Sequence, residues 1–143
     1  MANEVLVQAS LRIISGHIRY QSQPANFNDT LLSTKGPSPG AVTVSTEGTD
    51  IDFTELLVPG WCRLMNLDDT NFVTWGIWDP EGGKFYPCGE LGPGESYVIK
   101  MSRDLQQEFG TGTGTTGAET NRFRIKADSA PCDVLVEAFE AEL

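Results

Sequence analysis

The stretch that decides the fold is residues 61–101, WCRLMNLDDTNFVTWGIWDPEGGKFYPCGELGPGESYVIKM. Short runs rich in apolar and β-branched residues alternate here with breaks at 68–71, 79–83 and 91–95. The breaks contain Asp, Asn, Gly and Pro, which are the usual residues of tight turns. We therefore expect strands at 61–67, 72–78, 84–87 and 96–101. Short strands joined by frequent turns are typical of an antiparallel β-sandwich or jelly roll.

Two more strands are expected on the C-terminal side of this stretch. Residues 121–127 alternate, with Phe123, Ile125 and Ala127 predicted to face inward. Residues 132–139 are apolar on both faces, and Leu135 and Phe139 lie on the second face. Such a strand is either central in its sheet or covered by another subunit.

The N-terminal side is less regular. Apolar and polar residues alternate with period two in residues 4–14, which predicts one strand with a single solvent-exposed face. Residues 17–21 predict a short second strand. Residues 24–40 are rich in Asn, Ser, Thr, Pro and Gly, so we expect a long loop or an ordered arm. The whole chain, 1–143, is expected to form one all-β domain with an extended N-terminal strand or arm. Residues 1–40 would contact neighbouring molecules.

Composition narrows the classes of function. The chain has 143 residues, a formal charge of −10 and a pI of about 4.4, so it should repel nucleic acid. It has no apolar stretch near the ~20 residues of a membrane helix, and Met1–Gln8 do not look like a secretion signal. Its three cysteines are widely spaced, and we expect them to be buried free thiols.

No constellation for catalysis, metal or cofactor binding is recognisable. His17 is the only histidine, and no Gly-x-Ser-x-Gly nucleophile motif is present. The cysteines lack the short spacings of zinc ligands. The glycine-threonine tract 110–117 lacks the Gly-Lys-Ser/Thr ending of a phosphate-binding loop and is expected to be a flexible tip. Asp68 and Asp79 fit turns better than calcium ligands. We therefore expect a protein that binds rather than an enzyme.

One basic stripe is a candidate docking surface. Arg122, Arg124 and Lys126 project from the same face of one predicted strand, in a chain that is otherwise acidic. They could dock an acidic neighbour. Alternatively, they form a solvated face whose charges pair with adjacent strands.

The tryptophans suggest a second surface. Trp75 and Trp78 are predicted to lie on opposite faces of strand 72–78, and both faces are apolar. Packing in the core or against a partner explains them more simply than a sugar-binding platform. A carbohydrate-binding module remains the alternative, which a change of tryptophan fluorescence on adding polysaccharide would support.

A family resemblance adds to this picture. The run Arg63–Val73, with RLMNLDDTNFV, resembles a strand–turn–strand motif of small accessory virion proteins from tailed bacteriophages. Related motifs follow at Gly76-Ile77, Phe85–Pro87, Leu91–Glu95 and Lys126–Val136. The resemblance covers residues 60–139 and identifies no active residue.

The resemblance implies a virion structural protein, assembled in the host cytoplasm. We expect a decoration or cement component that binds capsid or neck proteins, with a tail or baseplate component as the alternative. A homo-oligomer is expected. The candidate interface residues are Arg122, Arg124, Lys126, Trp75, Trp78, Leu135 and Phe139.

Overall fold

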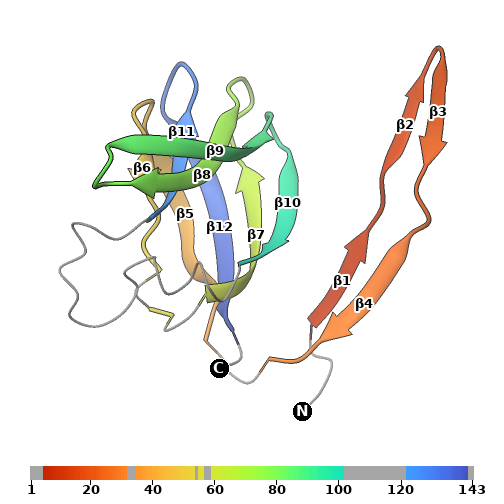
Figure 1. Ribbon diagram of the computed structural model, residues 1–143, viewed down its shortest axis with the longest axis horizontal. Coiled ribbons are helices and arrows are strands. Elements are labelled where there is room, and N and C mark those ends of the chain that lie inside the picture. Colours follow the sequence, from red (N-terminus) through yellow and green to blue (C-terminus); the bar gives the residue numbers. More distant parts are fainter. Residues whose placement is uncertain (1–4, 32–34, 54, 57–58, 102–121, 142–143) are drawn as a thin grey trace.

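The computed structural model of the chain describes residues 5–31, 35–53, 55–56, 59–101 and 122–141. These residues contain twelve strands and no helix, and hence no helix that could cross a membrane. The expected glycine-threonine tip at 110–117 lies outside them. Figure 1 shows a body formed by β5 to β12 and, apart from it, an arm formed by β1 to β4.

The body consists of two four-stranded antiparallel sheets packed face to face. The first sheet has the order β10-β7-β12-β5, formed by Ser96–Lys100, Pro59–Asn66, Cys132–Glu140 and Ser38–Val44. The second has the order β6-β11-β8-β9, formed by Thr49–Asp50, Arg122–Ala127, Val73–Asp79 and Lys84–Leu91. Within the described residues, the predicted strand–turn pattern of 61–101 is thus confirmed.

The order of pairing identifies the kind of sandwich. Along the body, the first strand pairs with the eighth (β5 with β12) and the second with the seventh (β6 with β11). The third pairs with the sixth (β7 with β10), and the fourth with the fifth (β8 with β9). This nested antiparallel pairing is the jelly roll, and it confirms the predicted fold class.

The core lies between the two sheets and is filled by alternate residues of their strands. Phe123, Ile125 and Ala127 are buried, as their spacing predicted. Strand β12 is central in its sheet, between β5 and β7, as one of the two alternatives for this strand predicted. Cys62 and Cys132 are buried free thiols, and burial raises the pKa of Cys62 to about 12. Cys88 is exposed, contrary to the expectation.

The N-terminal residues form a long two-stranded ribbon, the arm, that stands apart from the body (Figure 1). Its base pairs β1 (Val5–Ala9) with β4 (Ala25–Asp29), and its tip pairs β2 (Arg12–Ser15) with β3 (Ile18–Gln21). The single strand predicted at 4–14 is therefore wrong, because the chain breaks the ladder after Ala9.

Residues 24–40 were expected to form a long loop or an ordered arm, and the loop alternative is wrong in part. Residues 25–29 form β4, because they pair along their whole length with β1. Residues 38–40 begin β5, where Ser38 pairs with Ala138 of β12. Local composition hid both strands, since each is stabilised by a partner strand distant in sequence. The arm thus ends at Asp29, and β5 belongs to the body.

Candidate interaction surfaces

The arm is fixed to the body at its base by one carboxylate. Asp29, at the end of β4, accepts hydrogen bonds through Oδ2 from Trp61 Nε1 and from Lys100 Nζ, each at 2.7 Å. The Trp61 ring also packs against Phe27 of the arm, with ring centroids 5.8 Å apart. Lys100 lies over the same indole, 5.1 Å from its centroid. A polar and an aromatic contact together therefore hold β4 against β7 and β10.

The same contacts make Asp29 an unusually strong acid. Its pKa falls from 3.8 to about 2, chiefly through the hydrogen bond from Lys100 and then that from Trp61. The ionised carboxylate is favoured in the folded protein more than in the unfolded chain. Its stabilising contribution is therefore complete above pH 3.8 and is lost as the pH falls from 3.8 towards 2.

This behaviour gives a pH-dependent prediction for Asp29→Asn. At pH 7 the variant should unfold at a lower temperature than the wild type, because the amide cannot replace the charged contact with Lys100. The difference should shrink below pH 3.8 and vanish as the pH falls through 2, where the native carboxyl also becomes neutral. Thermal unfolding followed by circular dichroism across this range checks it. Asn28→Ala, an exposed neighbour in β4, is the control, and a difference independent of pH would contradict the assignment.

The arm tip exposes an apolar face. Cross-strand partners share a face, so Ile13 lies beside Tyr20, and Leu11 and Ile18 extend the same row. These four side chains are between 42% and 57% exposed. The opposite face carries Arg12 and Arg19, with Ile14 between them. In the described part of the chain, β2 and β3 pair only with each other.

Such a tip is unusual for a free protein. A lone two-stranded ribbon is marginally stable in water, and contiguous exposed apolar side chains commonly mark an interaction site. The short strand expected at 17–21 is present as β3, which pairs with β2 across the two-residue turn Gly16-His17. Sequence reasoning expected residues 1–40 to contact neighbouring molecules, but it did not foresee the apolar face of this hairpin.

An open cleft of about 330 Å³ lies between the arm base and the outer face of the first sheet. Val5, Leu6, Val7 and Leu31 line it from the N-terminal segment. The body contributes Trp61, Cys62, Arg63, Val98, Glu137 and Phe139. The two charged residues among these pair with each other, Arg63 Nη1 to Glu137 Oε1 at 2.6 Å. The lining is therefore largely apolar and close to neutral.

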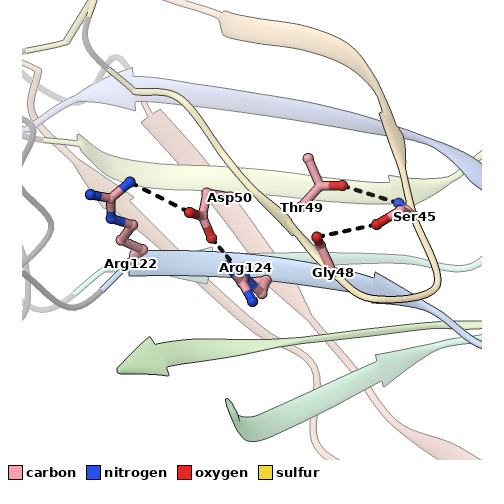
Figure 2. A network of polar contacts seen from close by, with 6 residues as sticks. All are labelled: Ser45, Gly48, Thr49, Asp50, Arg122 and Arg124. Atoms are coloured by element: carbon pink, nitrogen blue, oxygen red, sulfur yellow. Dashed lines mark hydrogen bonds and ion pairs between the residues drawn. The ribbon is translucent and has the colours of Figure 1, made fainter. Parts of the chain in front are cut away.

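Two of the three cations of the basic stripe form ion pairs within the chain. Figure 2 shows Arg122 and Arg124 both turned towards Asp50 of β6. The ion-pair distances are 3.5 Å from Arg122 Nη1 to Asp50 Oδ2 and 2.7 Å from Arg124 Nε to Asp50 Oδ1. The Arg124 guanidinium also lies 3.9 Å from the centroid of the Trp78 ring. These contacts match the solvated-face alternative for two of the three cations, and Lys126 remains exposed on the same strand.

The two predicted platform tryptophans have separate environments. Trp75 packs against the core and stacks on Phe123, with centroids 5.9 Å apart. Trp78 lies on the other face, beneath Arg124. Since the rings lie on opposite faces of β8, they do not form one flat surface for a sugar.

The remaining two candidate residues lie on the outer face of β12. Leu135 is half-buried, level with Met65 of β7 and Ala41 of β5. Phe139 lines the cleft, and Gly36 lies so close to its ring that a side chain there would collide with it. The structure thus brings Phe139 to the cleft and leaves Leu135 on the open part of the sheet.

Comparison of the chain with protein-family models, with curated proteins and with solved structures finds no match. Among the residues that the structure describes, no group of three His, Cys, Asp or Glu side chains could hold a metal ion. Asp68 and Asp79 instead accept hydrogen bonds from the backbone of their own turns. The surfaces that remain as candidates are the arm tip and the cleft.

Proposed function

We propose that this chain is a structural protein of a tailed-phage virion, which binds capsid or neck proteins as a decoration or cement component. The observation that carries the proposal is the arm, a ribbon with an apolar face presented away from a folded body. A protein that works alone would gain stability by burying that face. A component of a dense assembly buries it against its neighbours.

Two further observations support the proposal. The body is a jelly roll, an architecture common to viral capsid and lectin domains, although a fold by itself does not fix a function. The motif of residues 63–73, which resembles phage virion proteins, forms the β7 strand, the turn and the entry to β8. The lectin-like alternative lacks a shared aromatic platform, because Trp75 and Trp78 lie on opposite faces.

The test is whether the chain is part of particles. Particles purified from the organism that carries the gene should contain the protein in many copies, as measured by quantitative mass spectrometry. Labelled antibodies viewed by electron microscopy should bind at the head or neck. A phage encoding Ile13→Ser together with Tyr20→Ser should incorporate less of the protein, because the apolar face of the arm tip is lost.

Matched substitutions on the other face of the tip, Ile14→Ser with Gln21→Ser, provide the control and should leave incorporation unchanged. Label on the tail would favour the tail or baseplate alternative over a head or neck position. Absence of the chain from purified particles would overturn the proposal.

A further inference from the structure

The charge of the arm indicates which kind of partner surface its tip can bind. Residues 5–28 contain Arg12 and Arg19 and no acidic residue. Because the whole chain has a formal charge of −10, these two positive charges leave −12 for the rest. Two arms would therefore repel each other, whereas an arm and a body of the same protein attract each other.

The apolar side of the tip has a counterpart in the cleft. The cleft is lined mainly by apolar side chains, and Leu6 and Val98 on its two sides are more than half exposed. Its internal charges are already paired as Arg63–Glu137, so an apolar occupant leaves no unpaired charge. Burial of Ile13 and Tyr20 in this cleft would cover apolar surface on both partners.

A chain cannot fill its own cleft with its own tip. The base of the arm, through Val5, Leu6 and Val7, forms one wall of the cleft. The tip continues the ribbon beyond that wall and away from the body (Figure 1). An occupying tip must therefore come from another molecule.

We propose that the arm tip of one copy docks, by its Leu11, Ile13, Ile18 and Tyr20 face, in the cleft between arm and body of a second copy. The inference rests on the assembly role proposed above and names the partner as the chain itself. The contact is head-to-tail, since tip and cleft are different surfaces. Such a contact closes into a ring of two or more copies if its rotation allows, and otherwise extends as a filament.

The first experiment follows self-association of the full chain by sedimentation velocity from micromolar to submillimolar concentration. The wild type should associate, and added salt should weaken the association by screening arm and body. Ile13→Ser should raise the dissociation constant by about tenfold to a hundredfold, as expected for loss of one buried isoleucine. Ile14→Ser, a matched substitution on the arginine face, should change it little.

The second experiment separates the two surfaces. Val98→Lys places a charge on the body side of the cleft, at an exposed position, and should also weaken association. Mixed in equal amounts, Ile13→Ser and Val98→Lys chains should form dimers. The intact tip of the second variant can enter the intact cleft of the first.

Each possible result is decisive. A wild type that stays monomeric, or association unaffected by Ile13→Ser, overturns the inference. So does loss of association in Ile13→Ser together with normal association in Val98→Lys, which would place the tip on another surface. A mixture that forms no dimers also overturns it. A chain that is monomeric in solution but present in purified particles would refute this contact and leave the proposed function standing.

Discussion

Gly76→Ala should lower the free energy of unfolding by about 3 kcal/mol or more, the upper range for overpacking in a tightly packed site. A Cβ at Gly76 would collide with the Tyr86 carbonyl oxygen and would lie 2.9 Å from the Cα of Pro87. Both are backbone atoms of the paired strand β9, at the point where the ladder between β8 and β9 shifts register. The strands can accept a methyl group only by separating, which breaks hydrogen bonds of the β8–β9 ladder.

Thermal denaturation measures this effect, and the expected loss is about 10 °C in Tm. Gly16→Ala is the matched control, because no atom lies within 4 Å of a Cβ at that turn position. Its unfolding temperature should stay within about 1–2 °C of the wild type, as for surface changes in general. Equal behaviour of the two variants would mean that β9 does not approach Gly76 as closely as described.

Asn66→Leu should have the second large effect, about 3 kcal/mol, because it leaves backbone groups without hydrogen bonds inside the protein. Asn66 is fully buried, and its Nδ2 donates to the carbonyls of Asn71, Leu91 and Gly92 at 2.8–3.2 Å. Its Oδ1 accepts from the Asp68 amide at 3.0 Å. One side chain therefore joins the β7–β8 turn to the turn that leads into β10.

Urea unfolding at neutral pH tests the prediction, with Asn71→Ala as the control in the same turn. The Asn71 side chain accepts an exposed hydrogen bond from Ser129 Oγ and bonds the side chain of Asp68 at the surface of the turn, so its removal should lower stability by about 1 kcal/mol or less. A loss for Asn66→Leu no larger than for Asn71→Ala would show that water replaces the buried contacts.

Asn66 and Gly76 show how the motif of residues 63–73 and the strand after it are stabilised. Asn66 fixes the turn from within. Asp68 caps it by accepting the amides of Thr70 and Asn71, which hold its pKa below the ordinary value. Gly76 lets the next strand pass close to β9. The resemblance was drawn on residues that build strands and turns, so it informs the fold more directly than the function.

The body was predictable because its information is local. Alternation at 121–127 and turn residues at 68–71 and 79–83 each specify a strand or a turn within a few positions. The arm was less predictable from the sequence, because the residues of β4 have a weak preference for a strand. This strand is stabilised by pairing with β1 and by packing of Phe27 on Trp61. The engagement of Arg124 by Asp50 was equally hidden, since the two residues are 74 positions apart in the chain.

The nested pairing of the body also sets an order for its folding. Strand β5 must find β12, and Thr43 of β5 bonds Asp133 across 90 positions of sequence. In the first sheet, β5 and β7 have no strand between them until β12 has been synthesised. The arm, in contrast, pairs strands that are near each other in sequence. Long-range pairing is slow, and unpaired strand edges are prone to aggregate while they wait. During synthesis the apolar tip of the arm is therefore available before the body is closed, and recovery of soluble protein should depend on how fast β12 is incorporated.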